Sequence, residues 1–160
     1  MPQVYVAVGS NVEPQKNLSL ALAELRRSFA DARWSAAYRN AAVGFDGPDF
    51  INLVAGFTTG QSVEQVLSEL HRIETLCGRA RHAPKWEPRA MDLDMLLYGD
   101  EVRSGPPVTL PRPDLVKRPY MLGPMAEIAP EVRDPTLGLS MRELWQRFDR
   151  DAHAMTKVSL

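Results

Sequence analysis

Two amphipathic helix patterns, each following an apolar run with strand character, constrain the fold of this 160-residue chain more than any other feature. The first covers roughly residues 15–29, and the second covers residues 62–77, with Ser62 as its N-cap and Gly78 at its end. In both, apolar residues recur at the three- and four-residue spacing of one helix face. They are Leu18, Ala21, Leu22, Leu25 and Phe29 in the first pattern, and Val63, Val66, Leu67, Leu70, Ile73 and Cys77 in the second.

Four segments have strand character: residues 3–8, 33–38, 50–59 and 92–98. The first ends at a Gly-Ser-Asn turn, and Gly99-Asp100 after the last predicts a hairpin with residues 101–103. Proline is dense over residues 106–135, which indicates loops and short helices, and a final helix is expected from Ser140 through Phe148.

The resulting order, β-α-β-β-α-β with a tail, predicts an α+β fold with a ferredoxin-like βαββαβ core, in which an antiparallel sheet is flanked by helices. Because 160 residues is one domain's worth of chain, we expect residues 1–160 to form a single domain.

Composition and charge exclude several classes of protein. The chain is 44% hydrophobic and 24% charged, which argues against a disordered chain or a coiled coil. Its formal net charge of −1 is too low for a general nucleic-acid binder, so any anion must be held by a local cluster of cations. Cys77 is the only cysteine, which excludes an internal disulfide. With no signal peptide and no membrane-length apolar run, we expect a cytoplasmic protein that binds neither membrane nor nucleic acid.

The acidic pair Asp92 and Asp94 is the first candidate for chemistry. Residues two apart in a strand share a face, with Cα atoms about 6.6 Å apart, while Leu93, Met95 and Leu97 would face the other side. Two carboxylates this close repel each other unless a cation lies between them, and Mg²⁺ prefers such oxygen ligands. The alternative is a polar strand face exposed to water.

A basic segment, residues 79–90, leads directly into this acidic strand. Cations beside a metal-binding acid pair are what a polyphosphate requires, whereas either feature alone is consistent with a solvated surface. The segment also holds Trp86, which could stack on a heteroaromatic ring or anchor the loop. Its cations are Arg79, Arg81, Lys85 and Arg89.

Two residues of the 50–59 strand suggest recognition of a ring. Phe50 and Asn52 share a strand face, and an amide offers a donor and an acceptor to the edge of an aminopyrimidine-type ring. Asn52 is equally consistent with an ordinary strand-end asparagine. Gly9-Ser10 could cradle a phosphate but lacks the lysine and the glycine spacing of a P-loop.

The segment KWEPRAMDLDMLLYG, residues 85–99, resembles the signature of the 6-hydroxymethyl-7,8-dihydropterin pyrophosphokinase family. Further segments also match this family, and the resemblance extends over residues 3–150. The matching segments are residues 6–11, 38–39, 50–52, 72–74, 78–79 and 124–131.

This resemblance implies transfer of the β,γ-pyrophosphate of ATP to the hydroxymethyl group of a reduced pterin, with release of AMP. It implies two Mg²⁺ ions on Asp92 and Asp94, with Arg79, Arg89 and both aspartates as the catalytic residues. The nucleotide-binding residues would be Glu74, Arg79, Arg81, Lys85, Trp86, Arg89, Thr109, Arg112 and Arg118. The pterin-binding residues would be Asn40, Val43, Gly44, Phe50, Asn52 and Tyr120. The partners would be pterin and ATP, and we expect a monomer.

The chain departs from the family pattern at several positions. Glu87 replaces a glycine of the signature, Asn40-Ala41-Ala42 stands where Thr-Pro-Pro is common, Pro107 stands near a phosphate-binding arginine of some members, and Arg112-Pro113 replaces a His-Tyr pair. One alternative is therefore a divergent paralogue that binds Mg-ATP with a different pterin acceptor or has little activity.

Two further alternatives come from other classes. A non-catalytic nucleotide- or RNA-binding module could share the fold, but its strands would carry stacking aromatics and its charge would be higher. A nucleotidyltransferase would use Gly9-Ser10 with the acid pair, yet more than eighty residues separate them here.

Overall fold

An antiparallel sheet forms the middle layer of the computed structural model, which describes residues 1–41, 47–78, 91–149 and 155–160. Within these residues six strands join the sheet, in the order β5-β1-β4-β3-β6, with β2 pairing beside β3 on β4. All of the strand pairs are antiparallel. The strands are β1 (Gln3–Ser10), β2 (Arg33–Trp34), β3 (Ala37–Asn40), β4 (Phe50–Thr58), β5 (Asp92–Tyr98) and β6 (Thr156–Val158). This confirms an α+β fold with an antiparallel sheet.

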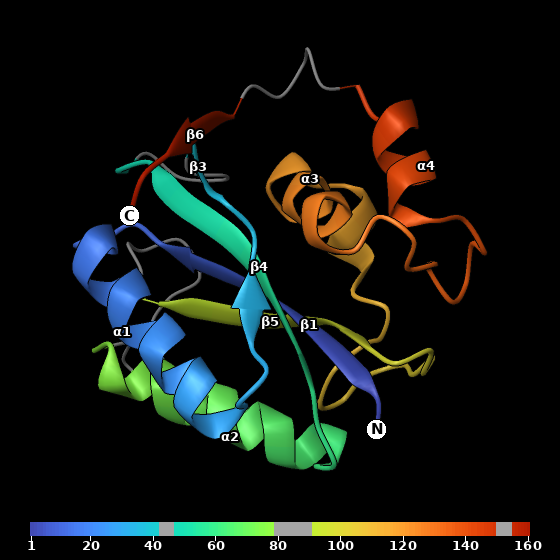
Figure 1. The fold of residues 1–160 in the computed structure, drawn as a ribbon, viewed down its shortest axis with the longest axis horizontal. Coiled ribbons are helices and arrows are strands. Elements are labelled where there is room, and N and C mark those ends of the chain that lie inside the picture. Colours follow the sequence, from blue (N-terminus) through green and yellow to red (C-terminus); the bar gives the residue numbers. More distant parts are fainter. Residues whose placement is uncertain (42–46, 79–90, 150–154) are drawn as a thin grey trace.

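Helices lie on both faces of the sheet (Figure 1). The helices α1 (Pro14–Ser28) and α2 (Val63–Leu76) lie side by side on one face, as the two helix patterns predicted. The helix α3 (Pro119–Ile128) crosses the other face, and α4 (Met141–Arg147) packs beside α3. A short 3₁₀ helix, η1 (Pro113–Val116), leads into α3.

Strand β1 is buried on both faces, which explains its unbroken apolar sequence. Its even residues, Val4, Val6 and Val8, pack with α1 and α2, whereas Tyr5 and Ala7 pack with α3. Hence two hydrophobic layers meet at one strand, and β1 connects them.

The two predicted helices end close to where their patterns end. Helix α2 begins with a capping box, in which the Ser62 hydroxyl accepts from the Gln65 backbone N–H and the Gln65 side chain accepts from the Ser62 N–H.

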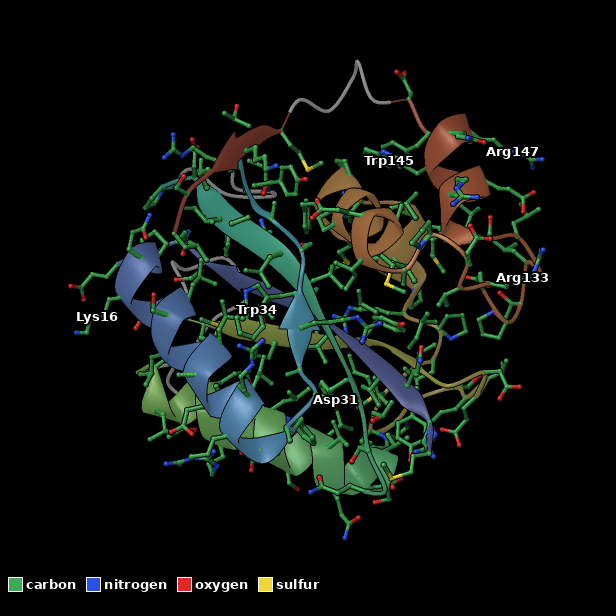
Figure 2. All side chains as sticks on the ribbon, viewed as in Figure 1. Lys16, Asp31, Trp34, Arg133, Trp145 and Arg147 are labelled. Carbon is green, nitrogen blue, oxygen red and sulfur yellow. The ribbon has the colours of Figure 1, made fainter. Side chains whose placement is uncertain are left out.

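Aromatic side chains pack on the face of the sheet that α1 and α2 cover. There the rings of Phe29 and Phe57 stack with centroids 3.9 Å apart. Trp34 lies beside α1 (Figure 2), and the guanidinium of Arg26 lies 4.3 Å from the centroid of its ring.

The predicted strand over residues 33–38 is interrupted. Two short strands, β2 and β3, both pair with β4 but are separated at Ser35 and Ala36. The Ser35 backbone N–H donates to the Val54 carbonyl, and the Ser35 hydroxyl accepts from the Val54 N–H. A side-chain hydroxyl thus replaces one ladder bond and gives the Val54 N–H an acceptor where the strand breaks.

The predicted hairpin between β5 and residues 101–103 is wrong. The Glu101 N–H donates to the Tyr98 carbonyl and closes a turn, and Arg103 then forms an isolated β-bridge with Leu110. The outer edge of β5 is instead approached by a later segment, in which the Arg112 N–H donates to the Leu96 carbonyl at 2.9 Å.

A β-bulge changes the predicted alternation in β5. Tyr5 pairs with Leu97 and Val6 pairs with Met95, so Leu96 has no direct partner on β1. Leu93 and Met95 pack with α1 and α2 as expected, but Leu97 packs with Leu96 on the α3 side. The extra residue therefore moves Leu97 to the face opposite the predicted one.

The last third of the chain contains the short helices that were predicted and one strand that was not. Helix α3 has ten residues with Pro124 inside it, and α4 begins after Ser140 with a capping box, as expected. The edge strand β6 was not predicted; it pairs with β3 through Ala37, Tyr38 and Arg39.

None of the helices in the described segments is both long and apolar enough to cross a lipid bilayer.

We expect Phe57→Ala to lower the free energy of unfolding by about 3–5 kcal/mol, because it removes a fully buried ring that stacks on Phe29. Urea unfolding followed by circular dichroism would measure the change. The matched control is Leu137→Ala, whose side chain is exposed and which should cost little. A loss at Phe57 no larger than the control's would contradict this account of the core.

Candidate functional site

Four residues form a row across the sheet on the side of α3. Asp92 of β5 pairs with Gly9 of β1, Gly9 pairs with Asn52 of β4, and Asn52 pairs with Tyr38 of β3. Directly opposed residues in an antiparallel sheet share a face. Since neighbouring strands lie about 4.8 Å apart, the Asp92 and Asn52 backbones are about 10 Å apart, on either side of a residue without a side chain.

Gly9 provides space for the amide of Asn52. A Cβ atom at Gly9 would lie 2.3 Å from the Asn52 Oδ1, a distance that real Cβ contacts do not reach. Asn52 is buried and donates through Nδ2 to Oδ1 of Asn40, which pairs in the sheet with Phe50. The structure therefore brings together three predicted pterin-binding residues, Asn40, Phe50 and Asn52, at one end of the sheet.

The predicted sharing of a face by Asp92 and Asp94 agrees with the structure. Leu93 between them packs with α1 and α2, so alternation directs both aspartates to the α3 side. Oδ1 of Asp94 lies 3.3 Å from Nη2 of Arg112, an ion pair in which each side chain is partly exposed. One of the predicted nucleotide-binding arginines thus contacts a predicted metal ligand directly.

Residues at the beginning of α3 lie near the same carboxylates. Arg118 precedes the helix and is 3.9 Å from Asp114. Burial raises the pKa of the Tyr120 phenol, with smaller contributions of the same sign from Asp114, Asp94 and Asp92 and an opposing one from Arg118. Tyr120 is therefore uncharged at neutral pH and can donate a hydrogen bond beside the acid pair.

Glu74 of α2 holds the backbone between the two aspartates. Its Oε2 accepts from the Leu93 N–H at 2.9 Å, and its Oε1 lies 3.6 Å from Nδ1 of His71. Glu74 is buried, so its carboxylate fixes the strand from α2. This backbone contact is a different role from the nucleotide contact that the sequence predicted, which stays a prediction.

The remaining predicted residues are less well placed or lie outside the described residues. The Thr109 hydroxyl accepts from the Gly105 N–H, and no described contact joins it to the carboxylates. The other predicted residues fall in the segments 42–46 and 79–90, and their roles stay predictions. They are Val43, Gly44, Arg79, Arg81, Lys85, Trp86 and Arg89.

Sequence reasoning missed the network that ends the row. The Tyr38 hydroxyl donates to one oxygen of Glu127, whose other oxygen accepts from the Ala36 N–H at 2.7 Å. Burial and the Glu127 carboxylate raise the pKa of Tyr38 to about 12. Both residues line a cavity of about 440 Å³ that also contacts Trp145. Only a spatial contact between β3 and α3 links them, and neither sequence position indicates it.

The acid pair suits a hard divalent cation that shares its coordination with a ligand. Within the described residues, no three His, Cys, Asp or Glu side chains gather as a metal cage. Mg²⁺ usually takes one or two carboxylates together with waters and phosphate oxygens, so Asp92 and Asp94 on one face fit that donor set. The site therefore fits a metal-bound phosphate better than a metal held by protein alone.

Comparisons with known proteins show what this sequence is similar to. Residues 5–130 match the family model of 7,8-dihydro-6-hydroxymethylpterin-pyrophosphokinase. A 2-amino-4-hydroxy-6-hydroxymethyldihydropteridine pyrophosphokinase from Haemophilus influenzae is 34% identical over 99% of both chains. An enzyme of the same name from Synechocystis sp. is 37% identical over 90% of this chain and 75% of its own length. A folic acid synthesis protein from Pneumocystis carinii is 29% identical over 90% of this chain and 20% of its own.

We expect Gly9→Ala to displace the Asn52 amide and to lower the free energy of unfolding by about 1–3 kcal/mol, because the added methyl group would overlap Oδ1. The side-chain amide resonances of Asn52 and Asn40 should shift in the NMR spectrum. The control is Gly60→Ala, where the nearest atom to a new Cβ is the Met1 sulfur at 3.4 Å. Unchanged Asn52 resonances in Gly9→Ala would refute the close approach.

We also expect Glu74→Ala to speed hydrogen exchange at the Leu93 amide and to cost about 1–3 kcal/mol of stability, because a buried N–H loses its acceptor. Glu74→Gln keeps an acceptor oxygen and should retain most of the protection. Exchange measured by NMR at single residues would report both variants. Equal protection in wild type and Glu74→Ala would show that this contact does not hold the strand.

Proposed function

We propose that this chain, which belongs to the 7,8-dihydro-6-hydroxymethylpterin-pyrophosphokinase family, transfers the β,γ-pyrophosphate of ATP to the hydroxymethyl group of 6-hydroxymethyl-7,8-dihydropterin. The product AMP is released, and the reaction belongs to folate biosynthesis. The observation that carries this assignment is that one sheet face holds the acid pair and the buried amide of Asn52, with Gly9 between Asp92 and Asn52.

Asp92 and Asp94 would hold two Mg²⁺ ions. Bound there, the ions would neutralise charge on the phosphates of ATP and help to orient them. Support for the site comes from its donor set, since two carboxylates on one face leave coordination positions for phosphate oxygens. The arginines around it, Arg112 and Arg118 among the described residues, would bind the nucleotide by charge-assisted hydrogen bonds.

The pterin would lie at the other end of the row. The Asn52 amide can offer a donor and an acceptor to the edge of an aminopyrimidine ring. Phe50 at the start of β4 and Tyr120 at the start of α3 would flank the ring, since each belongs to an element that borders the row. In this arrangement the hydroxymethyl group would point from Asn52 toward the acid pair.

The reaction needs little covalent chemistry from the protein. The substrate hydroxyl oxygen attacks the β-phosphorus in line, and the bond from that phosphorus to the oxygen bridging to the α-phosphorus breaks. The hydroxyl proton passes to solvent water, and AMP departs with the bridging oxygen. Catalysis would then depend on positioning the two substrates and on stabilising the developing phosphate charge.

We propose a ferredoxin-like core for the fold. The strands β1, β3, β4 and β5, in the sheet order β5-β1-β4-β3 with α1 and α2 on one face, support it. We further propose a cytoplasmic monomer with no nucleic-acid or membrane partner, in keeping with a net charge of −1 and two small-molecule substrates.

A second candidate is a related enzyme with a different pterin acceptor. It is favoured by the contact of Asn40 with Asn52, because position 40 departs from the family pattern and touches the amide that would read the ring. A panel of pterins compared by turnover separates the candidates. A clear preference for 6-hydroxymethyl-7,8-dihydropterin would eliminate the second.

We expect Mg-ATP and 6-hydroxymethyl-7,8-dihydropterin together to yield AMP, and Asp92→Ala and Asp94→Asn each to lower its rate at least about a hundredfold, the usual cost of losing one electrostatic group from a catalytic site. Liquid chromatography of the nucleotides measures the product. The matched control is Asp100→Asn, an exposed aspartate just beyond the far end of β5, which should keep full activity.

Three results would count against the proposal. Pterin-independent AMP would indicate hydrolysis instead of transfer. Full activity in Asp94→Asn would remove the acid pair from the mechanism. No AMP with any pterin, in spite of nucleotide binding by calorimetry, would leave a nucleotide-binding relative without this transfer activity.

A further inference from the structure

Two nitrogen atoms of the Arg112 guanidinium have different surroundings. Its Nη2 lies 3.3 Å from Oδ1 of Asp94, whereas its Nε is buried and has no hydrogen-bond partner among the described residues. A buried N–H donor without an acceptor is unfavourable, so an oxygen from a ligand would be favoured there. The guanidinium is thus attached to a carboxylate on one side and lacks an acceptor on another.

The backbone holds Arg112 in place at the edge of the sheet. Its N–H donates to the Leu96 carbonyl of β5 at 2.9 Å, and its carbonyl accepts from the Leu115 N–H at 3.1 Å. Pro111 and Pro113 flank it, and a proline ring restricts the backbone. The positive charge is therefore fixed to the same strand that carries the aspartates.

A fixed cation at this place acts oppositely on the two ligands of the site. It reduces the attraction of Asp92 and Asp94 for a divalent cation, because like charges repel over a few ångströms. It increases the attraction for the anionic phosphates of a nucleotide. Arg112 should therefore weaken binding of metal alone and strengthen binding of metal together with nucleotide.

We propose that Arg112 couples metal binding to nucleotide binding: it holds Asp94 in the absence of nucleotide, opposes binding of a divalent cation alone, and donates from Nε to an oxygen of the nucleotide. This inference rests on the proposed function, because it takes Asp92 and Asp94 as the metal ligands. It adds to the expected nucleotide contact a direct control over the metal site.

The test measures binding, not turnover. Mn²⁺ is used in place of Mg²⁺. Electron paramagnetic resonance measures the concentration of free Mn²⁺ as the ion is titrated into the nucleotide-free protein. Arg112→Ala and Arg112→Gln, two neutral variants of different size, should bind Mn²⁺ alone at least about threefold more tightly than wild type. Arg112→Lys keeps the charge and should stay within about twofold of wild type.

A control for total charge is available on α4. Arg147→Ala also removes one positive charge, at the outer end of that helix away from the sheet (Figure 2), and should leave Mn²⁺ binding unchanged. With a non-hydrolysable ATP analogue present, the order should reverse, and both neutral Arg112 variants should bind the metal–nucleotide complex more weakly than wild type. By linkage, the gain in metal affinity that the analogue produces should be smaller in these variants.

The outcomes separate this inference from the proposed function. If both neutral variants bind Mn²⁺ without nucleotide as tightly as wild type, or more weakly, the coupling role is overturned. An equal loss of metal-alone and metal–nucleotide binding would mean that Arg112 merely orients Asp94, which also overturns it. Mn²⁺ that binds wild type and Asp94→Asn equally, with and without the analogue, removes the metal site itself, and with it the proposed function.

Discussion

Pairing of β1 on both of its edges determines the rest of the structure. Its ladder with β4 extends from Gln3 to Ser10, and its ladder with β5 covers most of the same residues. Because β1 is also buried on both faces, its register aligns two strands that are distant in the chain. Because of that alignment, Asp92 and Asn52 share one row, with Gly9 between them.

The acid pair is held from two directions by groups of opposite character. From α2, the buried Glu74 carboxylate accepts the backbone N–H of Leu93 and keeps the strand in place. From the α3 side, the Arg112 guanidinium contacts the Asp94 side chain. The first contact fixes the backbone and leaves the aspartate side chains unengaged by Glu74, whereas the second involves the Asp94 carboxylate itself. Only the second contact would therefore compete directly with the proposed metal.

Local patterns in the sequence predicted the elements well and their interactions less well. The periodicity in α1 and α2, the Ser62 and Ser140 caps, and the shared face of Asp92 and Asp94 all follow from spacing within one segment. The break at Ser35 depends on a hydroxyl that meets Val54, and the position of Leu97 depends on a bulge against β1. Such features need a partner strand, which a single segment does not specify.

The site shows the same division. Strand alternation could place Phe50 and Asn52 on one face, but the space over Gly9 and the contact with Asn40 arise from three strands in register. Likewise, the sequence identified Arg112 as a cation in an unusual place without indicating its partner. The edge of β5 explains that partner, because the Arg112 N–H donates to the Leu96 carbonyl on the edge where a hairpin strand was expected, and the guanidinium contacts Asp94 from there. The error about the hairpin and the new contact of Arg112 thus have one physical cause.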